Sequence, residues 1–418
     1  MAVDICLRYG NEDIWANIPQ CRFLGEVRPN SQTPVDDLNK EIIGSLRCPV
    51  NSEPLRVLAR GVRKAVVVIS DRTRPLPSHL ILPVLFGELE EAGISKDSVT
   101  VIIGIGNHRP VTEQEKAALL GPLYGQVRCF HSRETGYTLL GITKRGTPVE
   151  VSVPLAQADL VVALGNIEIH QLAGYTGGVK AVAVGAASHS ALEHNHRLST
   201  LGESGPGLLE ENIVRHDMEE FARIANLGFI LNVVINETGQ VVHLVAGDPI
   251  DAHRVGCIAA EKMYRVRITE AADIVIVSPG GEPKDNTVYQ AQKTVQNALK
   301  AVKDGGIIIV AAKCPEGLGD PVFEEWMNQA SSPGDIEGRS RREFVLGGHK
   351  AAFLAGAVKK ARIFWVSGLL PATVRKLFFE PYESLQAAVN TACEIKGSEA
   401  RVLVIPWGGI TVPQPGEG

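Results

Sequence analysis

The 418-residue sequence has no apolar run that approaches the roughly 18 residues needed for a membrane-spanning helix. It also has no surplus of basic residues, because 42 Lys and Arg stand against 47 Asp and Glu and give a net charge of −5. Nucleic acid and anionic membrane surfaces are therefore not expected as partners. The first residues lack a basic segment followed by an apolar core, so no secretory signal is expected either.

Cysteine spacing gives no sign of disulfides. Seven cysteines are scattered along the chain, and none forms a C-x-x-C pair. They are Cys6, Cys21, Cys48, Cys129, Cys257, Cys314 and Cys393. An odd number of widely spaced cysteines is typical of free thiols, and a protein with free thiols is expected in the reducing cytoplasm.

Short apolar runs rich in β-branched residues alternate with helical stretches in both halves of the chain. The predicted strands are residues 3–9, 14–18, 64–70, 99–104, 160–164, 229–235, 272–278, 307–312, 363–366 and 402–405. The stretch from residue 19 to about Asp36 reads as irregular. The alternation predicts an α/β fold with two domains, each a doubly wound sheet with flanking helices.

The domain boundary has to be inferred from pattern, because no low-complexity linker and no internal repeat marks it. A chain of 418 residues exceeds one ordinary domain. Pro249 opens a predicted connector helix, residues 249–264. We therefore predict an N-terminal α/β domain of residues 1–265, which ends in that helix, and a C-terminal α/β domain of residues 266–418.

The stretch from Gly165 to Arg197 holds four of the eleven histidines and a lysine framed by glycines. The predicted strand 160–164 ends just before it. That strand is expected to deliver Asn166, Glu168 and His170 to the crevice where α/β folds bind ligands.

The glycines of this stretch favour a ligand-binding loop. Gly174, Gly177 and Gly178 allow the backbone to turn and to approach a ligand closely, and Lys180 follows them as a fixed cation. A phosphate-binding P-loop is a weak interpretation, because Ala181 stands where a P-loop has a hydroxyl residue. The simpler alternative is a glycine-rich turn with a solvated lysine.

Three further histidines, His189, His194 and His196, fall within eight residues. Imidazole is the commonest neutral metal ligand, although an isolated histidine is more often an ordinary surface residue. Their position beside a glycine loop of cofactor size favours a site over three unrelated surface residues.

Polar residues follow two other predicted strands. The segment S-D-R-T-R-P-L-P carries Asp71 and Arg74 at the end of strand 64–70, and G-I-G-N-H carries His108 at the end of strand 99–104. On pattern alone, Asp71 is equally well explained as a residue of a functional site and as the cap of a helix start. In the second half, the motif P-G-G-E-P-K-D-N-T-V-Y-Q-A-Q-K ends at Lys293, which on its own reads as a solvated helix residue.

The order of His108, His170, the segment G-Y-T-G-G-V-K that ends at Lys180, and the N-H pair at His196 resembles the nickel-dependent lactate racemase family. The motif ending at Lys293 is similar to one that the family carries in the same place. The resemblance runs over nearly the whole chain, with separated motifs in the family's order.

The resemblance implies a nickel pincer nucleotide, a pyridinium-3,5-bisthiocarboxylate mononucleotide whose two sulfurs and ring carbon hold nickel. Lys180 is then its covalent attachment point, as a thioamide, and His196 is the protein ligand to nickel. Gly177, Gly178 and Asp71 are the further cofactor-binding residues. Residues 1–265 would therefore form the domain that anchors the cofactor.

The same resemblance implies a racemase or epimerase that inverts C2 of a 2-hydroxy acid. Hydride passes to and from the cofactor through a 2-keto acid intermediate. His108 and His170 are the implied acid/base pair, each a base in one direction and an acid in the other. Arg74 and Lys293 are the implied ligands of the substrate carboxylate. Since they lie in different predicted domains, the active site is expected in the cleft between the domains.

The substrate stays open among lactate, malate, longer 2-hydroxy acids and sugar acids. Arg72 and Val179 stand where lactate racemase has histidine and arginine, and Glu168 is a variable position, so all three are expected to influence substrate choice. Proteins that make the cofactor are implied partners. Two alternatives remain: a histidine-ligated metal-dependent hydrolase or lyase without the tethered cofactor, and a noncatalytic phosphate- or nucleotide-binding protein.

Overall fold

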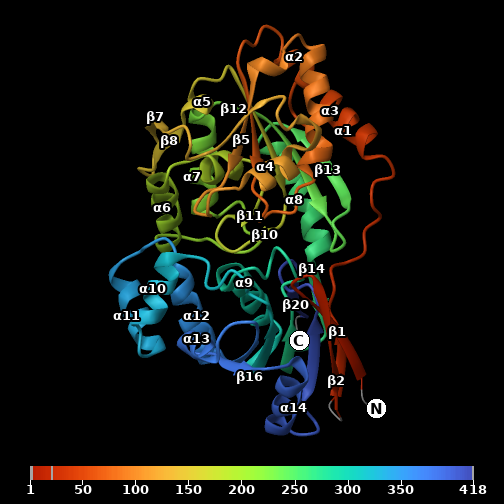
Figure 1. Ribbon diagram of the computed structural model, residues 1–418, viewed down its shortest axis with the longest axis vertical. Helices are drawn as coiled ribbons and strands as arrows, with labels where there is room; N and C mark the ends of the chain where they lie inside the picture. The colour runs from red at the N-terminus through yellow and green to blue at the C-terminus, as the bar shows by residue number, and fades with distance from the viewer. Residues whose placement is uncertain (1–2, 20–21, 417–418) are drawn as a thin grey trace. The chain divides into compact units, whose positions relative to one another are not determined.

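The computed structural model describes residues 3–19 and 22–416. The chain divides into two compact units (Figure 1). One unit comprises residues 31–262, and the other combines the first thirty residues with residues 263–418.

The unit of residues 31–262 is built on a six-stranded sheet with the order β13-β12-β9-β4-β5-β6. Its strands are β4 (Ala65–Ser70), β5 (Val99–Gly104), β6 (Arg128–His131), β9 (Leu160–Asn166), β12 (Leu227–Ile235) and β13 (Val241–Gly247). All neighbours run parallel except β13, which is antiparallel to β12. The chain proceeds from β4 outward through β5 and β6, and then returns to β9 on the other side. The point where the strand order reverses therefore lies between β4 and β9, which is where such sheets bind ligands.

Both faces of this sheet are covered, which explains the continuous apolar runs of its strands. On one face, Val67 and Ile69 of β4 share a core with leucines of α3 (Ser78–Glu91) and with α1 (Leu38–Arg47). The other face is contacted by α7 (Ile213–Ile224) and by the short π-helix η3 (Ala181–Gly185), which packs against β4, β5 and β9.

The remaining elements of this unit are α2 (Leu55–Leu58), η1 (Lys96–Ser98), α4 (Glu113–Leu120), η2 (Gly121–Leu123), β7 (Tyr137–Ile142), β8 (Pro148–Ser152), α5 (Val153–Ala156), β10 (Ile169–His170), β11 (Gly174–Tyr175), α6 (His189–Arg197), η4 (Leu198–Thr200) and α8 (Asp251–Tyr264). A helix is present in the range predicted for the connector, as α8, and its last two residues belong to the second unit.

The second unit has a six-stranded parallel sheet with the order β18-β17-β16-β15-β19-β3. Its strands are β3 (Arg22–Glu26), β15 (Ala272–Val277), β16 (Val302–Ala311), β17 (Ala361–Val366), β18 (Glu380–Tyr382) and β19 (Arg401–Ile405). The other elements are β1 (Val3–Tyr9), β2 (Glu12–Ile18), β14 (Arg265–Ile268), α9 (Val288–Ala298), α10 (Pro321–Gln329), α11 (Pro333–Arg342), α12 (Gly348–Lys360), α13 (Pro371–Lys376), α14 (Leu385–Lys396) and β20 (Val412–Pro415). The predicted α/β class with doubly wound sheets is thus confirmed.

The N-terminal segment joins this second unit, whereas the sequence placed it in the first. The antiparallel pair β1 and β2 packs with α14 over one face of the sheet, where Ile5, Leu7 and Ile18 are buried against Ile274 and Ile276 (Figure 1). The irregular stretch predicted after residue 18 contains β3, which pairs with β19 as an edge strand. Because an edge strand is specified by its partner, a short R-F-L-G-E segment gave no strand signal.

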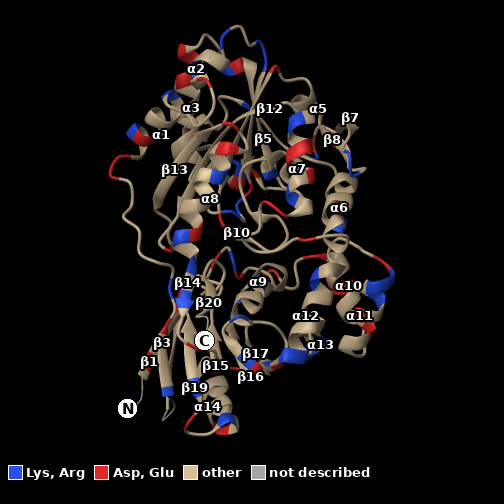
Figure 2. Cartoon of the chain, turned by 180° about the vertical axis from the view of Figure 1, so that it is seen from behind, with Lys and Arg blue, Asp and Glu red and all other residues tan. Residues whose placement is uncertain are grey.

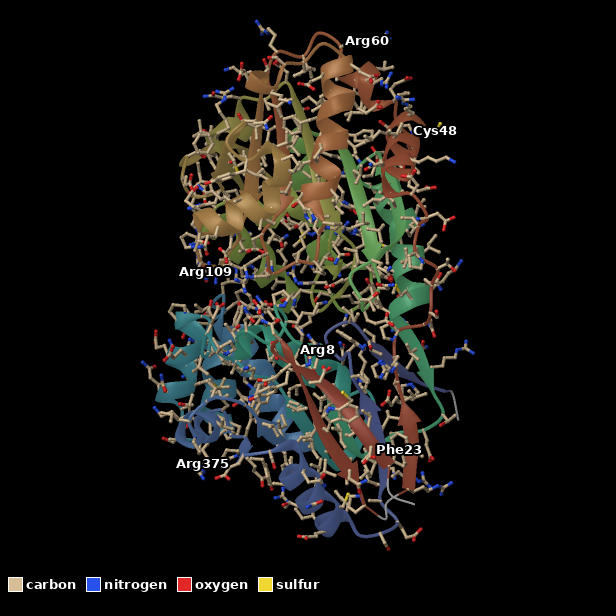
Figure 3. All side chains as sticks on the ribbon, turned by 45° about the vertical axis from the view of Figure 1, so that its right-hand side comes forward. Arg8, Phe23, Cys48, Arg60, Arg109 and Arg375 are labelled. Atoms are coloured by element: carbon tan, nitrogen blue, oxygen red, sulfur yellow. The ribbon has the colours of Figure 1, made fainter. Side chains whose placement is uncertain are left out.

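Acidic and basic residues are interspersed along the chain in both units (Figure 2). Six described cysteines are free, and Cys48 lies exposed at the surface (Figure 3). Cys21 lies outside the described residues. Within the described ranges, no helix is both long and apolar enough to span a membrane.

Candidate functional site

A histidine and an aspartate meet at the ends of the adjacent strands β4 and β5. His108 Nδ1 lies 2.6 Å from an Asp71 carboxylate oxygen, and the other carboxylate oxygen accepts bonds from the Thr73 hydroxyl at 2.6 Å and its backbone N–H at 3.1 Å. Asp71 is 4% exposed. Burial opposes its ionisation, but the nearby His108 and the hydrogen bonds from His108 and Thr73 outweigh burial and lower the pKa of the carboxyl below its ordinary value. Asp71 is therefore an ionised partner that orients His108.

The neighbouring arginines differ in what they contact. Arg72 donates to Glu115 at 3.0 Å, and Arg109 binds the same carboxylate at 2.7 and 2.9 Å. Glu115 also completes the predicted capping box of α4 with Thr112, which is confirmed. The hydrogen bond from Arg109 is the largest cause that lowers the pKa of Glu115, to about 2. Arg72, predicted to influence substrate choice, is thus tied to a structural carboxylate, while Arg74 follows Asp71 in the same loop.

The loop after β9 carries the second predicted histidine. Glu168 is buried, and Asn166 donates to its carboxylate at 3.2 Å. His170 ends the short strand β10, and its Nδ1 accepts the backbone N–H groups of Leu172 and Ala173, each at 3.2 Å. The polar residues that follow β4 and β9 thus flank the point where strand order reverses.

The glycine loop is hydrogen-bonded to a side chain of β12. Gly177 and Gly178 have φ of 75° and 56°, a conformation that glycine adopts without strain. Asn232 accepts the Gly178 N–H at 2.7 Å. Lys180 ends the loop at the start of η3 and is 7% exposed, and Val179 is 1% exposed.

Two buried residues under the loop were missed from the sequence. A Cβ on Gly178 would lie 2.7 Å from His253 Cδ2 and 3.0 Å from Arg215 Nη2. Arg215 donates to His253 Nδ1 at 2.6 Å, while His253 Nε2 donates to the Thr176 carbonyl at 2.8 Å. Burial first, and the adjacent Arg215 second, hold the pKa of His253 well below its ordinary value, so its ring is neutral.

The three clustered histidines have different surroundings. His189 is exposed, and His194 uses both ring nitrogens in contacts with the Arg145 carbonyl at 3.1 Å and with Arg197 at 3.1 Å. His196 is buried, with 7% exposure. Across residues 3–19 and 22–416, no three His, Cys, Asp or Glu side chains are grouped to hold a metal ion. The alternative of a metal held by the clustered histidines alone thus has no support in this geometry.

In the second unit, the strand order reverses between β15 and β19. The loop after β15 contains Gly280 and Gly281, with φ of 107° and 79°, and leads into α9, which carries Lys293. A Cβ on Gly280 would lie 2.5 Å from Trp407, so the turn requires glycine there. Lys293 is half-buried and follows the ligand-binding edge of its own sheet.

A buried, ionised carboxylate that holds a histidine at the carboxyl edge of a parallel sheet is an arrangement typical of α/β enzymes. Two family descriptions match the chain: the lactate racemase N-terminal domain over residues 9–207 and the lactate racemase C-terminal domain over residues 268–412. Lactate racemase of Thermoanaerobacterium thermosaccharolyticum is 32% identical, with 97% of this chain and 98% of that protein covered. Lactate racemase of Lactiplantibacillus plantarum is 30% identical, with the same coverage.

Solved structures agree with these sequence relationships. The lactate racemase apoprotein from T. thermosaccharolyticum superposes with a TM-score of 0.89 at 31% identity, covering 99% of this chain and 100% of that one. A Thermotoga maritima protein has a TM-score of 0.70 at 17% identity, covering 92% of this chain and 100% of that one, and shares the fold. The chain belongs to the lactate racemase family and is an isomerase of the racemase class.

Proposed function

We propose that this protein inverts C2 of a 2-hydroxy acid by way of a 2-keto acid intermediate. The observation that carries the proposal is the pair of His108 and Asp71, 2.6 Å apart, at the ligand-binding edge of a sheet in a lactate racemase family chain. Lactate is the first substrate to test because two relatives are named lactate racemase. Other 2-hydroxy acids and sugar acids follow, with chiral chromatography of the products as the measurement.

Lys180 and His196 fit a tethered nickel pincer nucleotide. A buried lysine is costly to keep charged, and a thioamide at Lys180 would remove that charge. His196 is the one buried imidazole of its cluster, so a nickel ion there needs further ligands, which a pincer ring provides. Gly177 and Gly178 keep the backbone beside Lys180 free of side chains. When bound, the cofactor would accept hydride from C2 and return it.

The chain's own residues bind the substrate and move its proton. We assign His108 and His170 to the acid/base steps at the substrate oxygen, because both follow strands at the ligand-binding edge of one sheet. Arg74 and Lys293 would hold the carboxylate and so fix the position of C2. Asp71, which the sequence resemblance placed with the cofactor, would act on His108 through their hydrogen bond.

Heavy water separates hydride transfer from proton abstraction. If hydrogen leaves C2 as hydride, substrate deuterated at C2 gives product that keeps most of its deuterium. A histidine that removed the same hydrogen as a proton would exchange it with water between steps. Deuterium entering C2 from heavy water at the rate of racemisation would therefore contradict the hydride route.

Loading of the protein is tested separately from its chemistry. We expect the intact mass to rise by one cofactor when the chain is made together with cofactor-building proteins, and to stay at the polypeptide mass without them. A mass that never changes in an active preparation would contradict the tethered cofactor. The six described free cysteines support a reducing location, for which we propose the cytoplasm.

A further inference from the structure

His170 lies on one arm of a hairpin whose other arm leads into the glycine loop. The arms are the short strands β10 and β11, and two residue pairs join them. His170 pairs with Gly174, and the second arm continues through Thr176 into the loop that ends at Lys180. A hairpin this short is marginally stable by itself, so contacts outside the strands must hold the arm of His170 in place.

The turn of this hairpin is held by the segment that precedes α7. The Asn212 amide donates to the Leu172 carbonyl at 2.7 Å, and the Gly207 N–H bonds to the Gly174 carbonyl at 3.0 Å. These bonds act at the turn, whereas the open end of the hairpin lies where the chain leaves β9 at Asn166. The open end therefore needs a support of its own.

The Thr176 side chain provides that support. Its hydroxyl donates to the Asn166 carbonyl at 2.6 Å and accepts the Glu168 N–H at 2.8 Å. The Thr176 N–H bonds to the Glu168 carbonyl at 2.8 Å and so closes the hairpin beside the hydroxyl. Thr176 is 4% exposed, so loss of the hydroxyl would leave buried backbone groups without this partner. One hydroxyl thus ties the end of β9 and the arm of His170 to the glycine loop.

The backbone of the glycine loop is fixed independently of that hydroxyl. The Thr176 carbonyl accepts a bond from His253 Nε2, on α8, at 2.8 Å. Two residues later, the Gly178 N–H bonds to Asn232 of β12 at 2.7 Å. The loop therefore has a defined place on α8 and β12, and the Thr176 hydroxyl relates the arm of His170 to that place.

We propose that the Thr176 hydroxyl is a positioning group that holds the arm of His170 in place relative to the loop that ends at Lys180. The roles of His170 and Lys180 in this inference rest on the proposed function. Inversion of C2 moves the substrate oxygen from one side to the other, so His108 and His170 must both stand at fixed distances from the substrate. Asp71 holds His108, and Thr176 would serve the opposite side. A displacement of about 1 Å can cost about 100-fold in rate.

A matched pair of substitutions isolates the hydroxyl. Thr176→Val keeps the shape of the side chain and removes the hydroxyl, whereas Thr176→Ser keeps the hydroxyl and removes a methyl group. In the loaded enzyme, we expect Thr176→Val to lower kcat by about 10- to 100-fold. Its KM should stay within about threefold of the parent, because Arg74 and Lys293 lie outside the hairpin. Thr176→Ser should keep kcat within about threefold of the parent.

Three results with the loaded enzyme would overturn the proposal. Equal losses of kcat in Thr176→Val and Thr176→Ser would show that the shape of the side chain matters and the hydroxyl does not. A raised KM with unchanged kcat in Thr176→Val would show a loss of substrate binding. Loss of the adduct mass or of nickel in Thr176→Val would show that the hydroxyl acts on cofactor attachment and not on His170.

Thr411→Val is the control for loss of a buried hydroxyl. Thr411 is buried in the second unit, and its hydroxyl donates to the Trp407 carbonyl at 2.9 Å. This variant loses a hydrogen bond of the same kind, so it should lower Tm while keeping kcat within about twofold of the parent. A fall in kcat equal to that of Thr176→Val would refute a specific role for Thr176. Circular dichroism shows that each variant folds.

Hydrogen exchange of the full chain without cofactor tests the hairpin apart from catalysis. At single-residue resolution, the Glu168 N–H should be protected in the parent and in Thr176→Ser, and should exchange faster in Thr176→Val. Rapid exchange of that N–H in the parent, or equal exchange in the parent and Thr176→Val, would overturn the proposal. A loaded parent that racemises none of the 2-hydroxy acids tested would refute the proposed function, whereas the exchange result would stand.

Discussion

Gly178→Ala is expected to destabilise the unit of residues 31–262 through two separate costs. A φ of 56° is strained for alanine, at about 1–2 kcal/mol. The new methyl would also lie 2.7 Å from His253 Cδ2 and 3.0 Å from Arg215 Nη2, in a buried place. Overpacking of that kind costs about 1–3 kcal/mol. The sum is about 2–5 kcal/mol, since both terms act on the same folded state.

Two matched glycines separate these costs. Gly239 has a φ of 84° but nothing within 4 Å of an added Cβ, so Gly239→Ala should cost the strain alone, about 1–2 kcal/mol. Gly87 lies within α3 with a helical backbone and open space, so Gly87→Ala should be neutral or stabilising by up to about 1 kcal/mol.

Thermal unfolding followed by circular dichroism measures the series. For a unit of this size, 1 kcal/mol shifts Tm by roughly 2–4 °C, so Gly178→Ala should lower the Tm of its unit by roughly 4–20 °C and Gly239→Ala by roughly 2–8 °C. If the Tm of Gly178→Ala equals that of Gly239→Ala, then His253 and Arg215 move aside without cost. The packing cost under the loop would then have been overestimated.

Three further predictions concern the cofactor residues and acid stability. Lys180→Ala should remove the covalent adduct and all racemisation, because no other amine stands in the loop, and a normal adduct mass on that variant would refute the attachment. His196→Ala should retain some adduct but lose nickel and activity, and metal analysis that finds full nickel would move the ligand role elsewhere. The pKa of Glu115 is lowered to about 2 in the folded protein, below its unfolded value. Its ionised carboxylate therefore adds to the free energy of unfolding above about pH 4.5, and this stabilisation is lost as pH falls toward 2. Glu115→Gln should therefore flatten the loss of Tm over that range, whereas the exposed Glu113→Gln should change it less.

The sequence predicted the central strands well and the contacts between side chains poorly. Val and Ile runs in β4 and β5 are buried on both faces, a property that leaves a local signal. Contacts between residues far apart in the sequence leave no local signal. Examples are the hydrogen bonds between Asp71 and His108 and between Arg72 and Glu115. The one usable signal that was missed is Asn232, a polar residue inside an apolar strand.

The sequence also could not predict which of the clustered histidines is buried. Spacing alone made His189, His194 and His196 equivalent candidates. Their helix α6 turns His194 toward Arg145 and Arg197 at the surface and buries His196. The family resemblance selected His196 because of the preceding asparagine, and that asparagine donates to Asp217 at 2.8 Å and so fastens α6 to α7.

The pairing of β3 with β19 makes residues 31–262 an insertion within another unit. The Asn30 N–H bonds to the Met263 carbonyl at 2.8 Å, so the two ends left by excising the insertion already touch. During synthesis, residues 31–262 are complete before β19 has been made. The strands β1 to β3 can therefore join their sheet only after the C-terminal part of the chain has been synthesised. A fragment that begins at residue 266 would expose the apolar face of the sheet that carries Ile274 and Ile276, whereas a chain joining residue 30 to residue 263 would keep that face covered by β1 and β2.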